Sequence, residues 1–204
     1  MELEARGVAV RATHGMMLEP TSVTARSGEV TVVAGPPGSG HVALALVLAG
    51  RLVPTTGRVR LDGESRPDRI PEVVAVVDCP GVSEPEEAVP LGTAVGEELA
   101  YAHASNTPRA ITRYLHSRGV SHLAQTRVAE VPGDIRISLF AELAAIRPGV
   151  EGLVLVCPDR YGATARHCSD VADSLAEAGY AVVLQLMGNT AMGLDVETAR
   201  MGVA

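Results

Sequence analysis

Lysine is absent from this 204-residue chain: its 17 basic residues are all arginine, and 24 carboxylates outnumber them. The formal charge of −7 gives no support to nucleic-acid binding, which requires a basic surface, so no nucleic-acid partner is expected. No apolar run reaches the roughly 18–20 residues needed to cross a bilayer. The opening MELEARG is not followed by the apolar stretch of a secretory signal, and we expect a cytoplasmic location.

Cysteine is scarce and dispersed. Cys79, Cys157 and Cys168 lie far apart in the sequence and form no C-x-x-C pair. The simplest interpretation is three reduced thiols in or near the core.

Apolar strands alternate with helical patterns along the chain. Strands are expected at 6–12, 21–26, 29–34, 58–63, 71–78, 152–157 and 180–187, with a further edge strand within 193–202. Helices are expected at 41–52, 93–104, 107–119, 135–146 and 162–179. Thr93, Thr107 and Asp134 stand at plausible N-cap positions. This order predicts one α/β domain over 1–204, with a mainly parallel sheet flanked by helices. Its core would be 1–79 and 148–204, and its helical insert about 80–147.

One short stretch suggests a ligand. GPPGSGHV nearly spells the phosphate-binding loop G-x-x-x-x-G-K-[ST], between an expected strand and an expected helix. Backbone amides and a helix N-terminus make an anion site that does not depend on side chains. The lysine position holds a histidine, and the Ser/Thr position holds a valine. The candidate binding residues are Gly35, Pro36, Pro37, Gly38, Ser39, Gly40, His41 and Val42.

The surrounding residues carry a resemblance to a family. LAGRLVPTTGRVRLDG (48–63) and LEPTSVTARSGEVTVVAGPPGSG (18–40) resemble the nucleotide-binding subunits of ABC transporters. The resemblance implies a P-loop NTPase-like fold with an inserted helical subdomain and an antiparallel N-terminal strand region. It also implies ATP or ADP as ligand. The implied partners are a membrane permease, a homologous ATPase or a second copy, which would place the chain at the inner face of the cell membrane.

Farther along, the family's chemistry is missing at each motif. Asp78 occupies the position of the family's Q-loop glutamine. VPGDI (131–135) occupies the position of the signature Leu-Ser-Gly-Gly-Gln. The Walker B strand should end in Asp-Glu and is followed by Cys157-Pro158, while Met187 stands for the switch histidine. No aromatic residue for adenine stacking occurs at 12–14.

These replacements predict that the chain lacks the family's catalytic residues, and we expect none of its residues to be catalytic. Magnesium is not expected, because Val42 lacks a hydroxyl and Cys157 is a poor ligand for a hard cation. His41 is interpreted as a helix-start residue, with weak phosphate binding as the alternative. Asp159 is interpreted as a surface or helix-approach residue, with metal binding as the alternative.

The leading hypothesis is therefore a degenerate ATP-binding subunit, inactive alone. One alternative is a scaffold that binds no nucleotide. Another is a phosphotransferase that uses His41, Asp78 and Asp159. A permease is expected to dock near 78–99, where SEPEEAVP (83–90) is either an ordinary solvated loop or a candidate docking surface.

Overall fold

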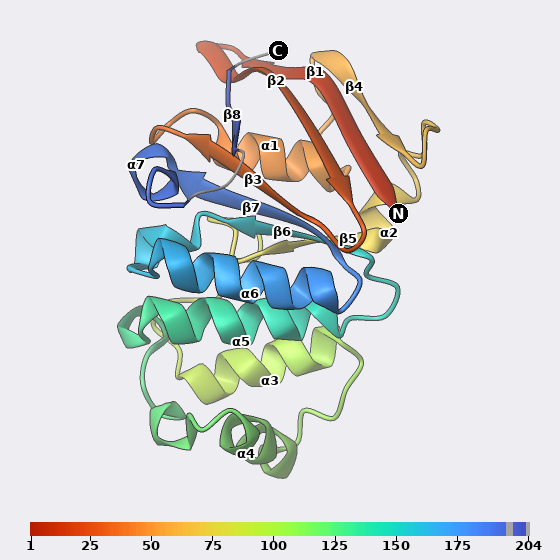
Figure 1. Cartoon of the computed structure of the whole chain (residues 1–204). Coiled ribbons are helices and arrows are strands. Elements are labelled where there is room, and N and C mark those ends of the chain that lie inside the picture. Colours follow the sequence, from red (N-terminus) through yellow and green to blue (C-terminus); the bar gives the residue numbers. More distant parts are fainter. Residues whose placement is uncertain (195–197, 203–204) are drawn as a thin grey trace.

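The computed structural model describes residues 1–194 and 198–202 and contains two sheets (Figure 1). An antiparallel sheet has the strand order β2-β1-β4, formed by β1 (Glu2–Ala12), β2 (Gly15–Arg26) and β4 (Thr56–Leu61). A second sheet has the order β5-β6-β7-β3-β8, and its paired strands are parallel. These strands are β3 (Val30–Gly35), β5 (Val74–Val77), β6 (Gly152–Val156), β7 (Ala181–Met187) and β8 (Thr198–Arg200). The predicted α/β class is confirmed.

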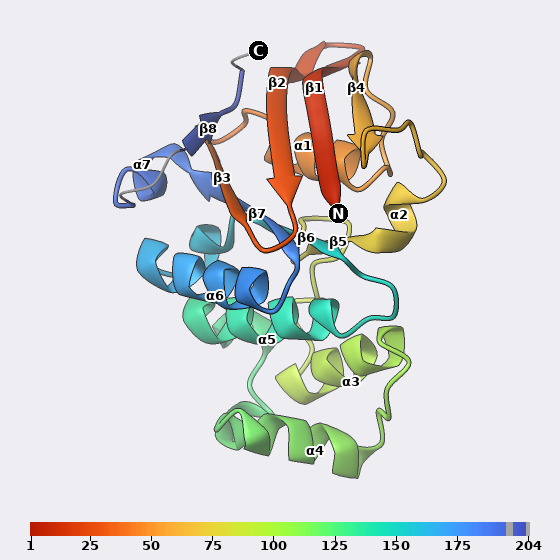
Figure 2. The same cartoon turned by 45° about the vertical axis from the view of Figure 1, so that its right-hand side comes forward.

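Helices cover both faces of the parallel sheet, as Figures 1 and 2 show. Between the two sheets lies α1 (His41–Leu48), and α5 (Gly133–Ala145) and α6 (Ala165–Glu177) cover the opposite face. Beyond α5 lie α3 (Leu91–Tyr101) and then α4 (Pro108–Ser117), at the far end of the molecule. The short helices are α2 (Ile70–Val73), α7 (Gly188–Ala191) and the 3-10 turns Ser121–Leu123, Val128–Glu130 and Pro158–Tyr161.

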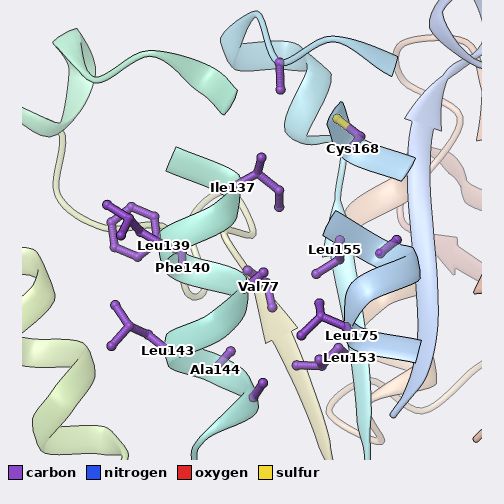
Figure 3. Packing of buried hydrophobic residues seen from close by; sticks show 14 of the residues in the cluster. Val77, Ile137, Leu139, Phe140, Leu143, Ala144, Leu153, Leu155, Cys168 and Leu175 are labelled. Atoms are coloured by element: carbon purple, nitrogen blue, oxygen red, sulfur yellow. The ribbon is translucent and has the colours of Figure 1, made fainter. Parts of the chain in front are cut away.

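The strands of the parallel sheet are apolar on both faces because each face is covered. Alternate residues enter two cores: Leu153 and Leu155 of β6 pack toward α5 and α6, whereas Val154 and Val156 pack toward α1. Figure 3 shows the first core, where Ile137 of α5 lies among residues of β5, β6 and α6. The sheet and the helices on both sides therefore hold the carboxyl ends of the strands in fixed positions.

Several predicted boundaries are wrong, for local reasons. The strand expected over 71–78 begins only at Val74, because 70–73 form the helical turn α2. Thr93 is not an N-cap, since α3 starts two residues earlier after Pro90. Asp134 is not an N-cap either: α5 starts at Gly133 after Pro132. Thr107 does cap α4, its hydroxyl accepting a hydrogen bond from the amide of Ala110.

The end of the chain agrees with the expected edge strand. Residues 198–200 form β8 beside β3, whereas 195–197 lie outside the described residues. Across the part of the chain that the structure describes, each helix is too short or too polar to span a bilayer.

Candidate functional site

The glycine loop follows β3 and leads directly into α1. Gly38 and Gly40 both adopt left-handed backbone conformations, with φ of 83° and 101°. A side chain on Gly40 would collide with the carbonyl oxygen of Met17, so glycine is required there. No side chain caps the N-terminus of α1, so no capping side chain accepts a hydrogen bond from the backbone amides of its first turn. The backbone therefore has the form of an anion-binding loop.

The loop's side chains are directed at the protein itself. His41 is 7 % exposed, and its Nε2 lies 3.3 Å from the carbonyl oxygen of Leu186 in β7. Burial lowers the pKa of His41, while the Leu186 carbonyl and the charge of Asp159 oppose that shift. Ser39 Oγ donates to Met201 Sδ at 3.3 Å. A neutral, buried imidazole adds little positive charge to the loop.

Four strand ends form a row along one edge of the parallel sheet. Gly35 of β3 is aligned with Met187 of β7, and β6 and β5 follow in order. The next residues after β6 and β5 are Cys157 and Asp78, whose φ angles are 45° and 52°. The structure thus brings together residues that are far apart in the sequence: the loop, Asp78, Cys157 and Met187.

Asp78 is not free at this edge. It is 4 % exposed, and both of its carboxylate oxygens accept hydrogen bonds at 2.7 Å from Nε and Nη2 of Arg136, which is 1 % exposed. The Arg136 guanidinium lies 3.6 Å from the ring centroid of Tyr161. Arg160 donates to the backbone carbonyl of Asp78 and to that of Val156.

Glu84 completes this ion-pair cluster, which we define as Asp78, Glu84, Arg136 and Arg160. Its Oε1 lies 3.8 Å from Arg136 Nη2 and 3.6 Å from Arg160 Nη2. Two positive and two negative charges therefore balance. The sequence analysis singled out Asp78 and, within the candidate docking stretch 83–90, Glu84, but it did not predict their pairing with Arg136 and Arg160. The one available signal was an arginine inside the apolar helix pattern 135–146.

The residues that follow β6 are also buried or hydrogen-bonded within the chain. The pKa of the Cys157 thiol is raised to about 12, chiefly by burial, so the thiol stays protonated. Asp159 lies half-buried in the turn Pro158–Tyr161, and its Oδ2 accepts a hydrogen bond at 3.0 Å from the amide of Met187. Its Oδ1 is buried and has no hydrogen-bond partner among the described residues.

The segment 131–135 is packed against the turn that follows β6. A side chain on Gly133 would collide with the backbone of Tyr161 and Ala163. Asp134 Oδ1 accepts a hydrogen bond from the amide of Thr164 at 2.9 Å, which explains why this carboxylate does not cap its own helix. The N-terminus of α5 is therefore bound to residues of the same chain.

The donor set matches phosphate better than metal. The left-handed glycines and the start of α1 supply backbone amides for an anion. At the two positions that supply a hydroxyl and a carboxylate to Mg²⁺ in P-loop proteins stand Val42 and Cys157. Neither side chain offers the oxygen ligand that Mg²⁺ prefers.

A parallel sheet with this loop at its edge defines an α/β domain of the P-loop NTPase type. The fold matches a nucleotide-free ATP-binding cassette from an ABC transporter, with a TM-score of 0.64 and 18 % identity over 98 % of this chain and 88 % of that one. An ATP-binding subunit of an ABC transporter matches with a TM-score of 0.65 and 14 % identity, over 98 % and 86 % of the two chains. A family model described as ABC transporter matches residues 18–135, which is more than half of the chain. The chain belongs to the ABC transporter family.

Curated relatives support the same assignment. A hemin import ATP-binding protein of Myxococcus xanthus is 43 % identical over 63 residues, which cover 31 % of this chain and 24 % of that protein. A cytochrome c biogenesis ATP-binding export protein of Rhizobium meliloti is 44 % identical over 66 residues, or 32 % of each chain. A hemin import ATP-binding protein of Pseudomonas entomophila is 27 % identical over 165 residues, 76 % of this chain and 63 % of that one. The first two matches thus span only a quarter to a third of the relatives' length.

Proposed function

We propose that this chain is a degenerate ATP-binding subunit of the ABC type, which keeps the nucleotide-binding fold and has lost ATP hydrolysis or retains it only weakly. One observation carries the proposal. The carboxylate at the expected Q-loop position is buried and bound on both oxygens by Arg136. A side chain held in this way cannot contact a magnesium ion or an attacking water molecule.

The other positions support the same conclusion. Pro158, where the family has its catalytic glutamate, has no polar side-chain atom to orient water. Asp134 adds negative charge at the start of α5, the segment that in an active dimer approaches the partner's γ-phosphate. We assign no catalytic residue, and the binding site is the loop from Gly35 to Val42.

The ligand we propose is ATP or ADP, bound weakly through the loop backbone and without the conventional magnesium contacts. The missing lysine removes a charge-assisted bond of about 1.5–3 kcal/mol, a loss of about 10–100-fold in affinity. Millimolar nucleotide is therefore the appropriate concentration range for detection.

Thermal unfolding tests this proposal. Nucleotide at about ten times Kd would stabilise the protein by about 1.4 kcal/mol, which raises Tm by about 3–6 °C at this chain length. Gly38→Ala should abolish the shift, because a Cβ strains the left-handed loop but meets no atom within 4 Å. Gly119→Ala is the matched control, with the same strain and the same open space in a distant turn. A nucleotide shift that persists in Gly38→Ala would place the binding elsewhere.

A scaffold that binds no nucleotide is the second candidate. Its support is that the side chains of Ser39 and His41 already bond to Met201 and Leu186 instead of facing a ligand. This candidate predicts no change in Tm with ATP or ADP at millimolar concentration, for the wild type and Gly38→Ala alike. The thermal experiment therefore separates the two functions.

The partner we propose is a membrane permease, alone or together with a homologous active ATPase, or a second copy of this chain. A hollow of about 430 Å³ between α3 and the loop after β5 supports permease docking; its lining includes Val82, Glu86, Glu97, Tyr101 and Arg147. Co-purification with a membrane protein encoded by a neighbouring gene tests the assignment. Glu86→Arg with Glu97→Arg should abolish co-purification, whereas retention by this variant would reject the hollow as the docking surface.

A further inference from the structure

The charge of this acidic protein is unevenly distributed. Residues 99–129 contain four arginines and three histidines and no carboxylate, so all 24 acidic residues lie elsewhere. Helix α4 is at the centre of this segment and lies at the extreme end of the molecule, farthest from the two sheets (Figures 1 and 2). The end of the helical insert is thus the basic pole of a chain whose formal charge is −7.

Two arginines of α4 have no counter-charge. Arg109 and Arg113 are exposed, and no carboxylate of the described residues forms an ion pair with either. Together with Pro108, Thr112 and His116 they line a shallow hollow of about 510 Å³ on the outer surface of the helix, here called the α4 outer face. Arg118 does not contribute, because Glu142 neutralises it.

This arrangement opposes two local preferences of a helix. Arg109 lies in the first turn, where the helix dipole disfavours a positive charge. Arg113 follows it by four residues, so two like charges repel on the same face. Positions that break local rules without an internal compensation point to a role outside the fold.

We propose that the α4 outer face binds the anionic phosphate headgroups of a phospholipid membrane surface. The apolar side of α4 cannot insert into a bilayer, because Leu115 is buried and Ile111 packs on the core. The contact is therefore electrostatic and peripheral. With α4 facing the membrane, the two sheets and the acidic residues they carry lie at the opposite end of the molecule (Figures 1 and 2).

A membrane surface fits this face better than a polynucleotide. Proteins that bind single-stranded nucleic acid combine a positively charged groove with aromatic rings on which the bases stack. The tyrosine of α4, Tyr114, is instead directed inward, where its hydroxyl donates to Glu142 Oε2 at 3.3 Å. A planar array of headgroups needs neither feature.

Vesicle co-sedimentation of the full chain tests the proposal. We expect binding to vesicles of three parts phosphatidylcholine to one part phosphatidylglycerol, and none to pure phosphatidylcholine. Each arginine near an anionic surface contributes about a fivefold factor, so Arg109→Gln with Arg113→Gln should lower the partition coefficient about 25-fold. The matched control is Arg11→Gln with Arg58→Gln, which removes two exposed arginines of the antiparallel sheet.

The outcomes separate clearly. Loss of binding in the α4 variant and retention in the control support the proposal. Equal binding to neutral and anionic vesicles, equal loss in both variants, or no binding at about 50 mM salt would overturn it. Binding of a short duplex oligonucleotide that depends on Arg109 and Arg113, without binding to vesicles, would also overturn it and assign the face to nucleic acid. Each result is independent of whether the glycine loop binds ATP.

Discussion

Removing Arg136 should destabilise the protein far more than removing an exposed arginine. Arg136 and Asp78 are 1 % and 4 % exposed, so Arg136→Met leaves a buried carboxylate without its main partner. Breaking such a pair costs about 3–5 kcal/mol. Arg160 Nη2 remains 3.7 Å from Asp78 Oδ1 and compensates in part, so we expect about 3 kcal/mol. At this chain length that lowers Tm by about 6–12 °C.

A double-mutant cycle isolates the pair. Arg136→Met combined with Asp78→Leu removes both charges and leaves Arg160 opposite Glu84, so the double variant should lose less stability than the two single variants together. Urea unfolding of the four proteins measures the difference. The control is the exposed pair Arg118–Glu142, where Arg118→Met should cost under about 1 kcal/mol. A cost below about 1 kcal/mol for Arg136→Met, or strict additivity in the cycle, would refute the description of a buried, coupled pair.

Three further results are expected. All three thiols should resist alkylation in the native protein at pH 8 and react on unfolding, because burial raises the pKa of Cys79 to about 11 and of Cys157 and Cys168 to about 12; fast labelling of the native protein would contradict this. Unfolding free energy should fall as the pH falls below about 6.5, and less so in His41→Gln, because burial lowers the pKa of His41 in the folded state and the unfolded chain binds the proton more readily; identical pH profiles would exclude His41 as the cause. Gly133→Ala should cost about 1–3 kcal/mol in urea unfolding, because its Cβ meets the backbone of the turn after β6; an unchanged midpoint would show that this contact can relax.

Local patterns in the sequence were sufficient for most of the fold. The strand before the glycines, the helix after them and the break between the strands at 21–26 and 29–34 were all predicted from local patterns. The parallel order followed from the alternation of strands and helices. The domain boundaries at 79 and 148 and the loop's role as a binding site stay predictions.

What the sequence could not indicate depends on contacts between distant residues. Arg136 and Asp78 are 58 residues apart, and no periodicity links them. Asp134 has the right chemistry for an N-cap, but the amide of Thr164, 30 residues away, takes its carboxylate. Asp159 likewise accepts a hydrogen bond from the amide of Met187, which is 28 residues away in the sequence. Tertiary hydrogen bonds overrode the local preference at each of these sites.

The most direct test of the central claim is phosphate release from ATP by the purified chain, with and without Mg²⁺. The account predicts release that is at most slightly above a heat-inactivated control, and an ATP affinity that Mg²⁺ leaves unchanged, because Val42 and Cys157 supply no oxygen ligand. Mg²⁺-dependent release of phosphate, together with Mg²⁺-dependent tightening of ATP binding, would contradict it.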